Sequence, residues 1–186
     1  MKKLLILALT LFCVGAGMEL KAQTQTNRKI LTVYFSWGGN TRTAARYVQR
    51  AVGGDMFEIK TVEAYPTEYR PATESAKREQ ETNARPALST RVNNMESYDV
   101  IFIGYPIWWG TIPMALFTFL ESYDFTGKTI IPFCTHGSSG LGRSVRDIEK
   151  LCPDAVIREG LAIRGAGVGN AQDEVNNWLR RLGMMK

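Results

Sequence analysis

Five short apolar runs alternate with segments of helical periodicity, and this alternation constrains the fold more than any other feature of the sequence. The runs lie at residues 30–35, 56–62, 100–104, 129–134 and 156–163. Strands that alternate with helices form a parallel sheet with helices on both faces. The runs at 30–35 and 100–104 are apolar almost throughout, as strands buried on both faces must be, so we place them in the middle of the sheet. The expected fold class is therefore α/β, with a doubly wound sheet of five parallel strands.

Helical patterns fill the intervals between these runs. Apolar residues recur at helical spacing over residues 41–52, and further helices are expected at 113–121, 144–151 and 171–182. Ser144 and Asp147 have the spacing of a capping box, and Asn170 is placed to cap the last helix. Residues 63–97 are polar and irregular, so we expect a loop and a solvated helix at 72–83 that together cover one edge of the sheet. Pro132 lies inside the fourth run, where its missing N–H calls for a bulge.

The first 22 residues have the layout of a secretory signal peptide. Lys2 and Lys3 precede an apolar run at residues 4–16, and Ala22 precedes a polar stretch. The run is shorter than the about 20 residues that a membrane-spanning helix needs. We expect cleavage after Ala22, a linker at 23–28, one domain at 29–186, and export to the periplasm with no stable membrane span after cleavage. An uncleaved N-terminal anchor is the alternative.

Charge and cysteine content narrow the possible functions. The 23 Lys and Arg residues exceed the 18 Asp and Glu residues, but they are scattered, which argues against a nucleic-acid partner. Cys134 and Cys152, the two cysteines of the mature chain, are too few for a disulfide framework. We expect them to stay unpaired, because the helix before Cys152 is roughly 12 Å long and a disulfide needs Cα atoms within about 7 Å. His136 is the lone histidine, and no cluster around it indicates a metal site.

Ligands of an open parallel sheet bind beyond the carboxyl ends of its strands, where the strand order reverses. The loop after the first strand is rich in glycine and leads into a helix, so its N–H groups can converge on a phosphate. The hydroxyl of Thr43 is a further candidate donor. Neither the Gly-Lys-Ser/Thr ending of a triphosphate loop nor Gly-x-Gly-x-x-Gly is present, so neither ATP nor a dinucleotide is indicated. The candidate phosphate-binding residues are Ser36, Trp37, Gly38, Gly39, Asn40 and Thr41.

The loops after the third and fourth strands carry the other candidate binding residues. In the first of them, two adjacent tryptophans suit stacking on a planar ring; its candidates are Pro106, Ile107, Trp108, Trp109 and Gly110. The second can offer backbone N–H groups to the carbonyl oxygens of a ring; its candidates are Thr135, His136, Gly137, Ser138 and Gly140. Each binding role has a purely structural alternative. These are a glycine-rich turn without a ligand, a tryptophan that fills the core, and an exposed loop histidine.

Taken together, the three loops resemble the flavodoxin family, and in particular flavodoxin-like proteins with a Tyr-Pro-x-Trp-Trp-Gly stretch. The segments that carry the resemblance are Ser-x-x-x-Asn-Thr, from Ser36 to Thr41, and Tyr-Pro-Ile-Trp-Trp-Gly, from Tyr105 to Gly110. The resemblance implies a flavodoxin-like fold with strand order 2-1-3-4-5, the phosphate of FMN on residues 36–41, and the isoalloxazine ring between the second and third loops. Familiar electron-transfer flavodoxins are acidic and cytoplasmic, whereas this chain is basic. We therefore do not expect it to share their partners.

The expected function is that of an FMN-binding redox protein of the periplasm. It would pass electrons to a partner protein or to a small quinone-like acceptor, and the flavin would do the chemistry without a protein acid or base. Trp109 is expected on the face of the ring, while Trp108 packs inward. Two alternatives are an NAD(P)H-dependent quinone or flavin reductase, for which Arg42, Arg143 or Arg164 would hold a nicotinamide phosphate, and a binding module without flavin.

Overall fold

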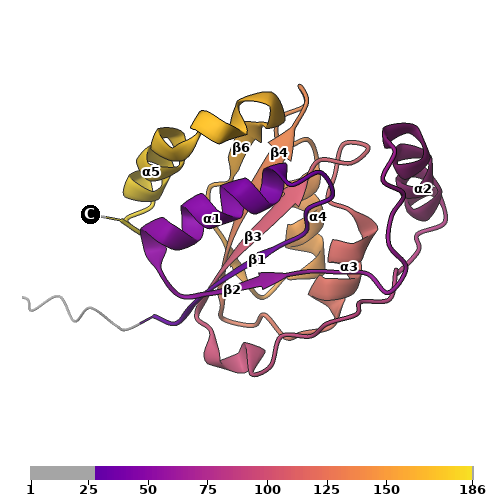
Figure 1. Ribbon diagram of the computed structural model, residues 1–186. Coiled ribbons are helices and arrows are strands. Elements are labelled where there is room, and N and C mark those ends of the chain that lie inside the picture. Colours follow the sequence, from indigo (N-terminus) through magenta and orange to yellow (C-terminus); the bar gives the residue numbers. More distant parts are fainter. Residues whose placement is uncertain (1–27, 186) are drawn as a thin grey trace, which may run out of the picture.

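A parallel sheet with the order β2-β1-β3-β4-β5 forms the centre of the fold, as predicted (Figure 1). The computed structural model describes residues 28–185; the predicted signal peptide and nearly all of the linker lie outside them. The strands are β1 (Ile30–Tyr34), β2 (Asp55–Glu58), β3 (Val100–Pro106), β4 (Thr129–His136), β5 (Val156–Ile157) and β6 (Leu161–Arg164), the last of which pairs with β4. The two most apolar strands, β1 and β3, lie side by side within the sheet, which confirms their predicted place.

Helices cover both faces of the sheet (Figure 1). The helices are α1 (Asn40–Val52), α2 (Tyr69–Glu81), α3 (Met114–Glu121), α4 (Ser144–Leu151) and α5 (Gln172–Arg181), with two short 3-10 helices, η1 (Met95–Ser97) and η2 (Gly165–Asn170). Val48 of α1 and Trp178 of α5 share one apolar core, while Phe119 of α3 and Ile148 of α4 share the other. Because side chains alternate along a strand, β3 supplies Phe102 to the first core and neighbouring residues to the second.

The fifth strand differs from its prediction. The expected strand at 156–163 is interrupted, and its two parts, β5 and β6, pair with separate parts of β4. The N–H of Arg158 donates to the Ile130 oxygen at 2.9 Å, so Pro132, two residues further along β4, faces the same side at the point of the interruption. On its other side β4 pairs with β3 in continuous register from Thr129 to Thr135. The predicted bulge within β4 itself is therefore wrong: the extra residue lies in the neighbouring strand, where residues 158–160 stand opposite residues 131–132, and this irregularity accommodates the proline.

Both predicted helix caps are also wrong. Ser144 is the first residue of α4, and its hydroxyl donates to the Leu141 oxygen at 2.6 Å instead of capping the helix. Asp147 accepts hydrogen bonds from Thr111 and from Arg143. Asn170 belongs to η2, and α5 begins without a side-chain cap. In α4, the two side chains that the local spacing assigns to a capping box therefore bind other partners, of which Thr111 is distant in the sequence.

The two described cysteines are free and buried, which confirms that they do not pair with each other. Burial raises the pKa of the Cys134 thiol to about 12 and that of Cys152 to about 11. Since the thiolate is the reactive form, we expect iodoacetamide to leave both thiols unmodified in the folded protein at neutral pH. Unfolding without a reductant should expose both to alkylation, as mass spectrometry would show. Rapid alkylation of the folded protein, or no free thiol after unfolding, would contradict this.

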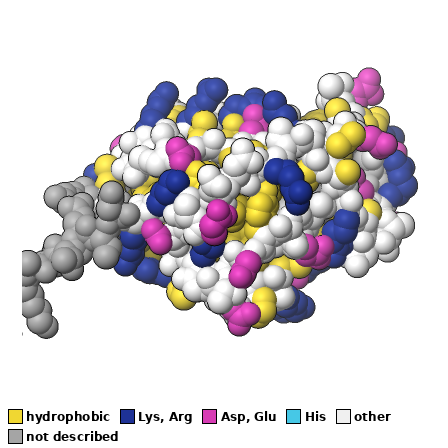
Figure 2. All heavy atoms as spheres, turned by 90° about the horizontal axis from the view of Figure 1, so that it is seen from below, with side chains coloured by type: hydrophobic (Ala, Val, Ile, Leu, Met, Phe, Trp, Pro, Cys, Tyr) yellow, Lys and Arg dark blue, Asp and Glu magenta, His cyan; other side chains and the backbone are white. Residues whose placement is uncertain are grey.

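No helix among residues 28–185 is long and apolar enough to span a membrane. Within the same residues, no three His, Cys, Asp or Glu side chains gather in a way that could hold a metal ion. Figure 2 shows Lys and Arg interspersed with Asp and Glu on the face that it displays. That face therefore presents mixed charge rather than a basic surface.

Candidate functional site

A cavity of about 510 Å³ lies where the three predicted loops meet. Its volume falls in the range of small-molecule and cofactor sites, about 300–1,000 Å³. The predicted residues that line it are Trp37, Asn40, Pro106, Ile107, Trp108, Trp109, Thr135, His136 and Gly137. The other predicted residues, which lie outside its lining, are Ser36, Gly38, Gly39, Thr41, Gly110, Ser138 and Gly140. The lining residues that sequence reasoning missed are Tyr69, Ala72, Thr73 and Ala76 of α2 and Gly165 and Ala166 of η2.

The first loop leaves several backbone amides without a hydrogen-bond acceptor at the start of α1. The Ser36 hydroxyl oxygen accepts the N–H groups of Gly39 and Arg42, each at 3.2 Å, and so fixes the curl of the loop. Gly39 has φ of 90°, which favours glycine. Within residues 28–185, the loop amides that have no hydrogen-bond acceptor are those of Ser36, Trp37, Gly38, Asn40 and Thr41. Such a cluster at a helix N-terminus is a favourable site for an anion.

A buried pair of hydroxyls joins the first loop to the third. Thr41 and Thr135 are 1% and 4% exposed, and their Oγ1 atoms lie 2.8 Å apart. One hydroxyl donates to the other, which leaves one hydroxyl hydrogen of the pair for another acceptor. The Thr43 hydroxyl instead donates to the Gly39 oxygen. Of the predicted hydroxyl donors, Ser36 and Thr43 therefore stabilise the loop itself.

The second loop is a tight hairpin that separates its two tryptophans. The N–H of Trp108 donates to the Thr111 oxygen at 2.9 Å, and the reverse bond is 3.1 Å. Trp109 and Gly110 have φ of 50° and 80°, the backbone of a two-residue hairpin turn with positive φ at both positions.

The two rings have different surroundings. The Trp108 ring packs edge-on against Phe35 and Tyr65, with centroids 5.4 and 4.9 Å away. Trp109 is 49% exposed, and its Nε1 donates to the Thr73 oxygen in α2. The Lys77 ammonium lies 5.4 Å from the centroid of the Trp109 ring. Trp108 is thus held by the protein body, and Trp109 is the ring with surface left to cover.

The third loop is held by contacts within itself and with its neighbours. The Gly140 N–H donates to His136 Nδ1 at 3.2 Å, so Nε2 is the remaining polar atom of the imidazole. The Arg164 guanidinium donates to the Gly137 oxygen at 3.2 Å. Ser138 is exposed on the outer side of the loop. The lone histidine is therefore a structural part of the loop that also reaches the cavity.

The second loop and the residues after the third loop approach each other backbone to backbone. Gly142 has φ of 55°, and a Cβ there would lie 2.4 Å from the Gly110 oxygen. The same oxygen accepts the N–H of Arg143 at 2.9 Å. This contact fixes the position of the turn that carries Trp109.

The arginines considered for a nicotinamide phosphate already have partners. Arg42 pairs with Glu58. Arg143 pairs with Asp147 at 3.2 Å. Arg164 is hydrogen-bonded to the Gly137 oxygen. A second anionic cofactor would have to displace one of these contacts.

The chain matches a family model described as flavodoxin over residues 29–182. A structure described as a putative flavoprotein from Bacteroides uniformis is 33% identical, with a TM-score of 0.72, and the match covers 82% of this chain and 98% of that one. A putative flavoprotein from Bacteroides eggerthii is 34% identical, with a TM-score of 0.66 and coverage of 80% and 98%.

A flavoprotein from Lactobacillus acidophilus, solved in complex with FMN, is 21% identical, with a TM-score of 0.63 and coverage of 77% and 97%. Comparison with curated proteins gave no significant match. The family match spans nearly all of the described residues, and the fold agrees with it. The chain belongs to the flavodoxin family.

Proposed function

We propose that this protein binds FMN in the cavity at the carboxyl ends of its strands and transfers electrons through it in the periplasm. The observation that carries the proposal is the cluster of free amides at the start of α1, beside a cavity lined with aromatic rings. Family membership and the FMN complex of the Lactobacillus acidophilus flavoprotein support it.

The residues present fit the two chemically different ends of FMN. The amides of Trp37, Gly38, Asn40 and Thr41 would hold the phosphate, because they are free and lie at the positive end of a helix. The apolar part of the cavity would take the ring, with the exposed face of Trp109 as the stacking surface. When bound, FMN supplies the electron transfer. The protein binds, orients and shields it, and this chemistry requires no protein acid or base.

Direct use of NAD(P)H is less well supported. The charges expected to hold a nicotinamide phosphate are paired or hydrogen-bonded, as described above. We therefore expect the FMN-loaded protein to oxidise NADPH no faster than free FMN does under the same conditions. Rapid, saturable oxidation of NADPH would favour the reductase instead.

Replacing Thr41 with valine tests the phosphate site. A hydrogen bond to a charged group contributes about 1.5–3 kcal/mol, so FMN binding should weaken about 10- to 100-fold. Riboflavin, which has no phosphate, should be affected much less. The matched control is Thr43→Val, because that hydroxyl binds the Gly39 oxygen and should not distinguish the two ligands. Equal losses of FMN and riboflavin affinity in Thr41→Val, measured by fluorescence titration, would show that Thr41 does not contact the phosphate.

A further inference from the structure

The inward face of α2 is built from small side chains. The helix contains no Leu, Ile, Val, Met or Phe, and its buried residues are Ala72 and Ala76. Both line the cavity, together with Thr73 and with Tyr69, which is 74% exposed. A surface helix normally packs a stripe of large apolar side chains against the core. Here α2 leaves space in the cavity where such a stripe would fill it.

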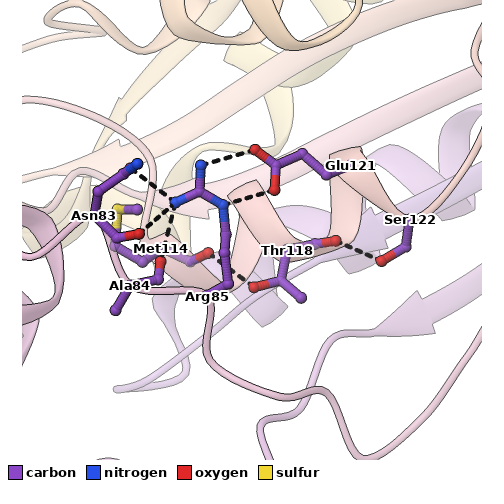
Figure 3. Close-up of polar contacts among 7 residues, drawn as sticks. All are labelled: Asn83, Ala84, Arg85, Met114, Thr118, Glu121 and Ser122. Atoms are coloured by element: carbon purple, nitrogen blue, oxygen red, sulfur yellow. Dashed lines mark hydrogen bonds and ion pairs between the residues drawn. The ribbon is translucent and has the colours of Figure 1, made fainter.

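Polar contacts hold this helix in place. Figure 1 shows α2 apart from the helices that cover the sheet faces. After its C-terminal end, Arg85 binds both carboxylate oxygens of Glu121 in α3, at 2.6 and 2.8 Å, and also binds Asn83 and the Ala84 oxygen (Figure 3). Within the helix, Glu79 accepts the Tyr65 hydroxyl at 2.8 Å. The helix is thus a fixed wall rather than part of the packed core.

The space against α2 suits an uncharged ring. Among the described residues that line the cavity there is no Asp, Glu, Lys or Arg, and His136 is the one basic side chain. The rings of Trp37 and Tyr69 lie at this side, with centroids 6.4 Å apart. Lys77, on the same helix, lies over Trp109 and pairs with Glu81 at 3.6 Å. The free amides that suit a phosphate belong to the first loop instead.

We infer that the space beside α2, bordered by the rings of Trp37 and Tyr69, binds the electron acceptor, and that this acceptor is an uncharged planar molecule of the quinone class. The inference rests on the proposed function, since the acceptor must lie beside the flavin. A dinucleotide would bring phosphates into a lining that has no Lys or Arg to pair with them. A quinone becomes a hydroquinone by taking up two electrons and two protons, and fully reduced FMN carries both, so the exchange balances.

Binding of naphthoquinone to the oxidised, FMN-loaded protein tests this inference. We expect the quinone to perturb the flavin absorption band in a saturable way, and naphthoquinone sulfonate to bind at least about tenfold more weakly, because its charge would be buried without a partner. Equal or tighter binding of the sulfonate would overturn the assignment of an uncharged acceptor.

Two variants locate the site. Ala76→Leu should fill the space and weaken naphthoquinone binding at least about tenfold, whereas Arg78→Leu adds the same side chain at an exposed position of α2 and should not. If Ala76→Leu does not fold, Tyr69→Ala serves instead, because that side chain is largely exposed; loss of its ring should weaken binding about two- to tenfold.

FMN affinity, measured separately, distinguishes failure of the acceptor site from failure of the proposed function. If the protein binds FMN but naphthoquinone leaves the flavin band unchanged, or the variants at Ala76 and Tyr69 bind it as Arg78→Leu does, the acceptor site is wrong and the proposed function stands. If the unmodified protein does not bind FMN, both are overturned.

Discussion

Replacing Trp109 with alanine should weaken FMN binding at least about tenfold and restore the fluorescence of the flavin. An aromatic stacking contact contributes about 0.5–1.5 kcal/mol beyond the burial of its area, and covering a half-exposed ring adds about 1–2 kcal/mol. The midpoint potential of the bound flavin should rise, because an electron-rich ring no longer lies beside the reduced flavin. The free energy of unfolding without FMN should change little, since Trp109 is 49% exposed.

The matched control is the neighbouring tryptophan. Trp108 packs against Phe35 and Tyr65, so Trp108→Ala should lower the free energy of unfolding by about 3 kcal/mol. Denaturant unfolding and flavin fluorescence separate the two roles. If Trp108→Ala alone restores fluorescence, then Trp108 is the stacking residue and the assignment of Trp109 is wrong.

Replacing Gly142 with alanine should destabilise the protein and also impair FMN binding. A left-handed backbone costs an alanine about 1–2 kcal/mol, and the collision of its Cβ with the Gly110 oxygen adds about 1–3 kcal/mol. Relief of the collision requires the Trp109 turn to move, so the affinity for FMN should fall together with stability.

Gly140→Ala isolates the effect of that collision. Gly140 has a similar φ of 60°, but nothing lies within 4 Å of a Cβ there. It should therefore show the backbone cost alone and keep its FMN affinity. Chemical denaturation and FMN titration of both variants provide the comparison. Equal effects of the two substitutions would mean that the contact between Gly142 and Gly110 does not position the turn.

The sequence predicts the sheet well because burial on both faces leaves a direct mark in the residue pattern. The apolar runs of β1 and β3 identify the middle of the sheet, and nine of the site residues predicted in and beside the loops after β1, β3 and β4 line the cavity. Side-chain geometry is less predictable. The accommodation of Pro132 depends on an interruption in the neighbouring strand, and Asp147 accepts a hydrogen bond from Thr111, which lies 36 residues away in the sequence.

The sequence does not predict that α2 lines the cavity. Its existence was predicted, but as a solvated cover for an edge of the sheet, whereas the structure places four of its residues in the cavity lining. A signal for this was present: Ala72 and Ala76 share a helix face that carries no large aliphatic side chain. Such a face has too little apolar side-chain volume to fill a core, and in the structure it borders the cavity instead. Helical periodicity alone does not reveal which structure lies opposite.

Titration of the purified apoprotein with FMN shows whether the cavity binds the cofactor. We expect flavin fluorescence to be quenched to an endpoint of one FMN per chain, because the ring enters a cavity lined by tryptophans and the phosphate binds the free amides of the first loop. Flavin fluorescence that stays unchanged as FMN is added in excess to folded protein would contradict it.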